Sequence, residues 1–117
     1  MDKKQLSNFS KRVFNLLLDH KFFIIRYYQK DLGRYLLLLK IMESYFSDFS
    51  MSQERILETI PSAVASRSSL LSTINQSLMK NYLKKIIDPN NKRARHIVPT
   101  EQLVDEFKQW MKLIHNE

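Results

Sequence analysis

Residues 88–100 read DPNNKRARHIVPT, a stretch that predicts a tight turn followed by a cationic and then β-branched run. Asp88, Pro89 and Asn90 suit the first three positions of a reverse turn, because the acid accepts hydrogen bonds, proline presets φ and asparagine tolerates unusual dihedrals. The runs on either side, YLKKIID and KRARHIVP, have strand-like composition. We therefore expect a β-hairpin with a positively charged tip.

The rest of the chain is typical of a helical protein. Its 117 residues are 44% apolar and include one glycine and three prolines, which favours long helices over loops or barrels that depend on glycine. Apolar residues recur at helical spacing over 6–18, 34–46 and 70–78, and again after residue 100. We expect mostly helix.

Single residues mark the expected helix ends. Asp2 or Ser7 can cap the first helix, Ser52 a short helix that Pro61 ends, and Thr100 the last helix. Asn81 can adopt the left-handed conformation that ends a helix. The one glycine, at position 33, predicts either a break or a close contact.

The order short helix, turn, polar-faced helix, charged hairpin, helix is that of a winged helix-turn-helix. The expected fold class is therefore mainly α with a small β-hairpin wing, a winged helix-turn-helix with N- and C-terminal dimerisation helices. Residues 1–50 supply N-terminal helices for core and dimerisation, 51–99 the winged helix-turn-helix, and 100–117 a C-terminal helix for core and dimerisation. Together they form one compact domain.

Positive charge is concentrated in one part of the chain. The formal net charge is +7, and residues 66–99 alone contain seven lysines and arginines against one acid, Asp88. Such a segment suits a polyanionic partner, because neutralised phosphates release counterions. A solvated basic face is the alternative interpretation. A membrane surface is not expected as a partner, because the cations cluster on the hairpin and not along a helix face.

The helix after Pro61 is the expected recognition helix. Its start, Arg67 and Ser68, should approach base edges or phosphates, and Gln76 further along could pair with both hydrogen-bonding groups of an adenine. The hairpin arginines alternate onto one face with Ile97. Caps, solvent-facing fillers and surface salt bridges are the alternative readings of these side chains. The predicted DNA-contacting residues are Arg67, Ser68, Ser69, Ser72, Thr73, Gln76, Lys80, Lys92, Arg93 and Arg95.

Residues 52–113 resemble the MarR-type (multiple antibiotic resistance) transcriptional regulators. The resemblance rests on ASRSSLLSTI as the start of a recognition helix, NYLKKI as the exit into the wing, and DPNNKRARHIVPTEQ as wing and following helix. The family wing commonly reads Asp-Pro-Asn-Asp-Arg-Arg-Ala before a strand and a Thr-Glu helix start. The matching residues are Asp88, Pro89, Asn90, Arg93, Ala94, Thr100 and Glu101.

The chain also departs from the family pattern. Asn91 replaces an acid that often braces a wing arginine, Lys92 replaces an arginine, and Asn81 replaces the customary glycine before the wing. Residues 61–63 occupy a turn where Leu-Gly is usual. The resemblance implies a homodimer, with N- and C-terminal helices at its interface, that binds palindromic duplex DNA.

The aromatic residues of the second helical region have two interpretations. Because relatives often respond to phenolic compounds, they could line a pocket for a small aromatic ligand. Alternatively they belong to the core or the dimer interface, where aromatic side chains bury large areas. The residues concerned are Phe22, Phe23, Tyr27 and Tyr28.

The sequence predicts no enzyme, no metal and no cofactor. His20, His96 and His115 are too far apart for a helical metal pair, no acid is placed beside a histidine in a way that suggests a relay, and no Gly-x-Ser-x-Gly elbow occurs. Without cysteine, a long apolar span or an apolar signal core, the expected location is cytoplasmic.

Two functions therefore compete. One is a dimeric transcription regulator with a specific operator, and the other is a winged-helix protein of replication, partition or protein contacts without one. A regulator should prefer its site over random duplex by at least about a thousandfold.

Overall fold

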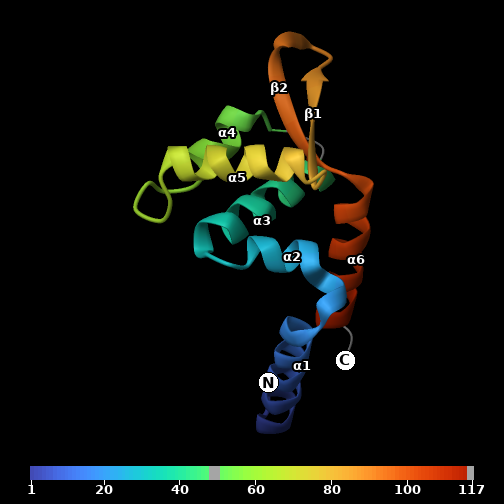
Figure 1. The fold of residues 1–117 in the computed structure, drawn as a ribbon. Helices are drawn as coiled ribbons and strands as arrows, with labels where there is room; N and C mark the ends of the chain where they lie inside the picture. Colours follow the sequence, from blue (N-terminus) through green and yellow to red (C-terminus); the bar gives the residue numbers. More distant parts are fainter. Residues whose placement is uncertain (48–50, 116–117) are drawn as a thin grey trace.

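The computed structural model describes residues 1–47 and 51–115 and shows, within them, a mainly helical chain with one antiparallel two-stranded hairpin (Figure 1). The predicted regions 1–50 and 100–117 end in residues 48–50 and 116–117, which lie outside the described residues. The elements are α1 (Lys3–Leu18), the 3-10 turn η1 (His20–Phe22), α2 (Phe23–Tyr28), α3 (Leu32–Phe46), α4 (Gln53–Glu58), α5 (Arg67–Met79), β1 (Leu83–Asp88), β2 (Asn91–Pro99) and α6 (Glu101–His115).

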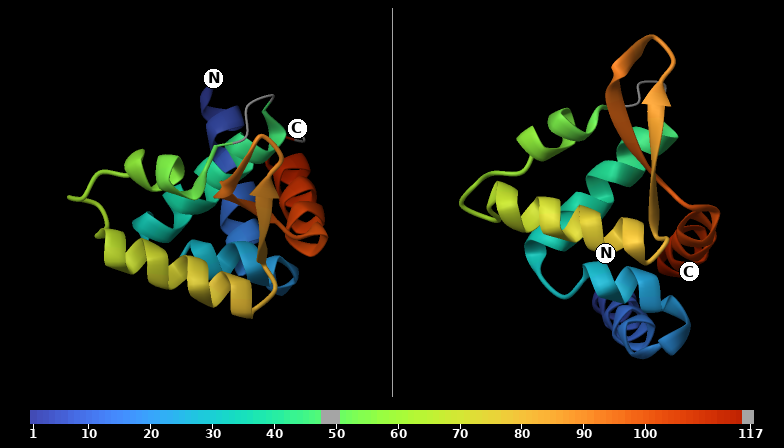
Figure 2. Two further views of the ribbon diagram at one scale, coloured as in Figure 1. Left: turned by 90° about the horizontal axis from the view of Figure 1, so that it is seen from above. Right: turned by 45° about the horizontal axis from the view of Figure 1, so that its top comes forward.

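The molecule is elongated, with extents of 52 × 29 × 27 Å. Helix α1 and the hairpin project from opposite ends, and α6 runs down one side from the base of the hairpin toward α1 (Figures 1 and 2). None of the helices within residues 1–47 and 51–115 combines the length and the apolar character needed to span a bilayer.

Side-chain caps begin several helices, as two of the sequence predictions require. The Asp2 carboxylate accepts from the Gln5 amide at 2.8 Å, and the Gln5 side chain accepts from the Asp2 amide at 3.0 Å, which is a reciprocal capping box. The hydroxyl of Ser52 accepts from the Arg55 amide at the start of α4. The predicted caps Asp2 and Ser52 are therefore confirmed.

The single glycine lies in the first turn of α3 and does not break the helix. A Cβ atom placed on Gly33 would stand 2.6 Å from the Cβ of Ala65, which is closer than two non-bonded carbon atoms normally approach. Glycine therefore allows α3 to press against the segment that precedes α5, and the prediction of a close contact is confirmed.

The core lies between α2, α3, α5, the base of the hairpin and α6. Tyr28 is fully buried, and its hydroxyl donates to the Ser77 Oγ at 2.7 Å, while Ser77 donates to the carbonyl of Thr73. Burial raises the pKa of Tyr28, so the phenol stays neutral. A second cluster joins α1 to α6. The main cluster includes Ile24, Leu37, Leu38, Ile41, Ile56, Ile74, Leu83, Ile97 and Leu103.

A buried carboxylate connects α6 to the start of α2. The Glu106 Oε2 atom accepts from the Ile25 amide at 2.7 Å and Oε1 accepts from the Ile24 amide at 3.4 Å. Since the N-cap residue of α2, Phe22, provides no side-chain bond, Glu106 satisfies these amides from another helix. Burial raises the pKa of Glu106, and the two backbone hydrogen bonds partly oppose that rise.

The joint between α5 and β1 is held by several hydrogen bonds. Asn81 has φ of 62°, and the amides of Asn81 and Tyr82 bond the carbonyls of Leu78 and Ser77, which forms a Schellman motif. The left-handed Asn81 is thus confirmed. Thr100, predicted to cap α6, directly precedes that helix, and its carbonyl accepts from the Val104 amide at 3.0 Å. Its hydroxyl donates to the carbonyls of Asn81 and Tyr82, at 2.9 and 3.1 Å, and so fastens the start of α6 to this joint.

Candidate functional site

The hairpin has the predicted turn but an irregular register. Pairing runs from Leu83 opposite Pro99 to Ile87 opposite Arg95, then shifts so that Asp88 lies opposite Asn91. Residues 92–94 consequently have no partner on β1, and regular alternation cannot fix the direction of the Arg93 side chain. Arg93 and Arg95 nevertheless line the same hollow, about 380 Å³ in volume, beside the start of α4.

All five lysines and arginines of the two strands are exposed. Within residues 1–47 and 51–115, none of them forms an ion pair with a carboxylate. The Nη1 atom of Arg95 donates to the carbonyl of Lys92 at 2.7 Å, a neutral acceptor that leaves the charge uncompensated. The hairpin cations are Lys84, Lys85, Lys92, Arg93 and Arg95.

The one acid of this segment is already engaged. Asp88 accepts from the Asn90 amide at 2.8 Å through Oδ1, and its Oδ2 lies 3.1 Å from the Nε2 of His96. Both side chains are largely buried, at 22% and 10% exposure. The sequence indicated no acid beside a histidine in a way that suggests a relay; folding of the hairpin nevertheless brings Asp88 and His96, eight positions apart, into contact. Asp88 therefore stabilises the turn.

The outward face of α5 is polar and weakly charged. Ser68 and Ser72 are exposed there, as predicted, and Asn75 and Met79 share the same face. Asn75 was not among the predicted residues, although its spacing of seven from Ser68 and three from Ser72 places it on this face. Asn75 is the longest hydrogen-bonding side chain on that outward strip.

Two residues of α5 that were predicted to contact DNA instead make contacts within the protein. Thr73 is 5% exposed and donates to the Ser69 carbonyl at 3.1 Å, so the expectation that it faces outward was wrong. Thr73 lies three residues after the buried Leu70, and residues at this spacing share one face of a helix. Arg67 instead binds Glu54 of α4, with Nη2 2.7 Å from Oε2, and this contact raises the pKa of Arg67.

The C-terminal part of α5 leans toward Tyr27 of α2. The Tyr27 hydroxyl donates to the Oε1 of Gln76 at 2.8 Å, and the Nζ of Lys80 lies 5.4 Å from the centre of the tyrosine ring. The predicted double contact of Gln76 with adenine needs the same amide oxygen. Because an amide oxygen can accept two hydrogen bonds, the contact with Tyr27 restricts the direction of the Gln76 side chain but does not by itself exclude that pairing.

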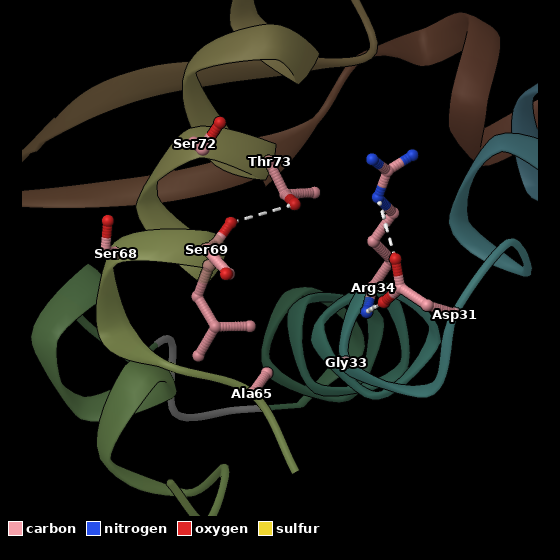
Figure 3. Close-up of a pocket in the computed structure, with 9 residues that line it drawn as sticks. Asp31, Gly33, Arg34, Ala65, Ser68, Ser69, Ser72 and Thr73 are labelled. Carbon is pink, nitrogen blue, oxygen red and sulfur yellow. Dashed lines mark hydrogen bonds and ion pairs between the residues drawn. The ribbon is translucent and has the colours of Figure 1, made fainter.

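A polar hollow of about 380 Å³ lies between the start of α3 and α5 (Figure 3). Arg34 from α3 faces the side of α5 that carries Ser69 and Thr73, and its Nε lies 3.1 Å from the Oδ2 of Asp31. Figure 3 shows the two terminal nitrogens of Arg34 pointing away from Asp31. The ion pair of Arg34 and Asp31 therefore lies at the edge of this hollow.

The aromatic residues proposed to line a ligand pocket are mostly core residues. Phe22, Tyr27 and Tyr28 are buried, whereas Phe23 is 54% exposed. Their burial matches the alternative interpretation as core residues, and a role in binding an aromatic ligand stays a prediction.

Helix α1, by contrast, leaves most of its apolar side chains uncovered. Only Leu16 is buried, through contact with the second core cluster. The exposed apolar residues of α1 are Leu6, Phe9, Phe14, Leu17 and Leu18.

Residues 1–47 and 51–115 contain no group of three or more His, Asp or Glu side chains placed to hold a metal ion. Comparison with models of protein families, with curated proteins and with solved structures finds no match to this chain. Function is therefore inferred from the side chains of α5, the hairpin and α1.

Proposed function

We propose that this chain is a dimeric winged helix-turn-helix protein that binds duplex DNA and regulates transcription, in the manner of the MarR type. One observation carries the proposal: five exposed cations without a carboxylate partner among the described residues stand on a hairpin joined directly to α5, whose outward face is polar. A phosphate backbone supplies the missing counter-charges.

In this proposal the outward face of α5 enters the major groove. Ser68 and Ser72 are short and permit close approach, and the Asn75 amide can bond the N6 and N7 groups of an adenine. The hairpin tip, with Lys92 and Arg93, meets phosphates or the adjacent minor groove. The Asp88 turn lowers the entropy lost when this tip docks.

The uncovered apolar side of α1 supports the dimer. Leu6, Phe9 and Leu17 lie on one side of this helix and are 50%, 38% and 46% exposed. A second copy that covered this stripe with its own would bury it. To read two half-sites, the α5 helices of such a dimer would have to lie about 34–36 Å apart. Sedimentation should show a dimer for the native chain and a monomer for Leu6→Glu/Leu17→Glu; a native monomer contradicts the dimer.

Two features favour the DNA-binding form of the second candidate, a winged-helix protein that acts in replication or partition without a specific operator. Arg67 is bound to Glu54, which leaves the outward face of α5 with few groups for reading bases. The connection between α4 and α5, residues 59–66, is also longer than the three or four residues of a typical helix-turn-helix.

Fluorescence anisotropy with a random duplex of about 30 base pairs, long enough for two half-sites, tests DNA binding. We expect the slope of log K against log salt to weaken by about 0.9 for each phosphate contact removed, hence by about 1.8 for Arg93→Gln/Arg95→Gln. The matched control, Lys3→Gln/Lys4→Gln on α1, removes the same charge at the far end of the molecule and should leave the slope unchanged.

Selection from a library of random duplexes then separates the two candidates. A palindrome preferred by at least about a thousandfold supports a regulator, whereas salt-sensitive binding without enrichment supports the second candidate. A native chain that shows no salt-sensitive binding to any duplex refutes both.

A further inference from the structure

A second group of cations lies on the side of α5 away from the hairpin. The Cζ of Arg34 lies 4.9 Å, the Nζ of Lys80 5.4 Å and the Nζ of Lys30 6.0 Å from the ring centre of Tyr27. These three residues, which we call the Tyr27 patch, come from α3, from the end of α5 and from the connection between α2 and α3. The fold therefore gathers charges that are far apart in the sequence.

The tyrosine that holds this patch is itself fixed. Tyr27 is 8% exposed, its ring packs edge-on against Tyr28 at 5.0 Å, and its hydroxyl is bonded to Gln76. A ring face attracts cations, so it can hold several of them close to one another. The patch thus has a defined place beside α5.

The Tyr27 patch retains net positive charge. Asp31 is the carboxylate that contacts it among the described residues, and this contact is with the Nε of Arg34. Lys30 and Lys80 are exposed to solvent. Three cations against one acid leave a charge of about +2 by this count, which attracts an anion.

The contacts of α5 define two flanks on either side of its outward strip. On one flank Arg67 contacts α4, and the hairpin with its cations, which comes after α5 in the chain, rises on this same flank. On the other flank Gln76 and Lys80, one turn apart, meet Tyr27. The strip that contains Ser72 and Asn75 lies between these flanks.

We infer that the Tyr27 patch binds the phosphate backbone of duplex DNA on the strand opposite to the one that the hairpin contacts. This inference rests on the proposed function. A helix in the major groove, about 12 Å wide, has one backbone along each flank. A cationic group on either flank of α5 can therefore contact both strands at once.

The test uses the full chain and the same random duplex. Lys30→Gln/Lys80→Gln should weaken the salt slope by about 1.8, so that affinity falls about 12-fold less than in the native chain between 50 and 200 mM salt. Lys30→Arg/Lys80→Arg keeps the charges and should keep the slope, and Lys3→Gln/Lys4→Gln again serves as the control. Thermal unfolding by circular dichroism checks that each variant is folded.

The outcomes separate this inference from the proposed function. If Arg93→Gln/Arg95→Gln weakens the slope and Lys30→Gln/Lys80→Gln behaves like the control, DNA binding stands and the inference is wrong. If the native chain shows no salt-sensitive binding, both fail.

Phosphate-ethylation interference tests the assignment to strands. On a site obtained from the duplex selection, the Lys30→Gln/Lys80→Gln variant should lose interference on one strand of each half-site, and the Arg93→Gln/Arg95→Gln variant on the other strand of the same half-site. Loss at the same phosphates in both variants overturns the two-strand arrangement.

Discussion

Replacement of Gly33 by alanine should destabilise the protein through one contact. The new methyl carbon would stand 2.6 Å from the Cβ of Ala65, an atom bonded directly to the backbone, so relief requires the segment before α5 to move. Overpacking of this kind costs about 1–3 kcal/mol, whereas alanine in place of glycine in a helix contributes about 1 kcal/mol of stability. We therefore expect a net loss of about 0–2 kcal/mol in the free energy of unfolding.

A double-mutant cycle isolates this contact. Urea unfolding of Gly33→Ala, Ala65→Gly and the double variant should give a coupling energy of at least about 1 kcal/mol, because Ala65→Gly removes the methyl group that the new side chain meets. Since Ala65 precedes Ser66, the N-cap of α5, the single variant should also bind duplex DNA more weakly than the double variant. A Gly33→Ala variant as stable as the native chain, with no coupling to Ala65→Gly, refutes the close contact.

Three further measurements address the core, the hairpin and a titrating group. Tyr28→Phe leaves the buried Ser77 hydroxyl without its donor and should cost about 1 kcal/mol by urea unfolding, and an unchanged midpoint contradicts this. Asp88→Ala removes the acceptor of the turn and the partner of His96, so the hairpin amides should exchange hydrogen faster while those of the core stay protected. Because burial raises the pKa of Glu106, the folded state holds this proton more firmly than the unfolded state. The free energy of unfolding of the native chain, compared with that of Glu106→Gln, should therefore decrease as pH rises from the ordinary glutamate pKa through the raised value. An increase over this pH range would mean that the pKa of Glu106 is lowered in the folded state.

Features set by neighbouring residues could be predicted from the sequence. The caps at Asp2 and Ser52, the left-handed Asn81 and the Pro-Asn turn each depend on the conformational preferences of one to four consecutive residues. The helical fold with a charged hairpin follows from the same local signals together with the spacing of apolar residues.

Features set by contacts between elements could not be predicted in this way. Thr73 lies at the edge of the apolar face, and only the packing of α5 against α3 decides that it is buried. The pairing of Arg67 with Glu54 depends on where α4 lies, and the approach of His96 to Asp88 depends on the irregular hairpin register. The Tyr27 patch joins three separate elements, so no spacing within the sequence indicates it.

The Schellman turn at Asn81 and the hydroxyl of Thr100 lock the angle at which the hairpin leaves α5. Because this connection is held by several hydrogen bonds, the hairpin is not expected to rotate relative to α5 when the protein binds a partner. Under the proposed function the duplex must bend to contact both α5 and the hairpin. DNA sequences that bend easily would then be bound more tightly, even where the bending base pairs contact no side chain.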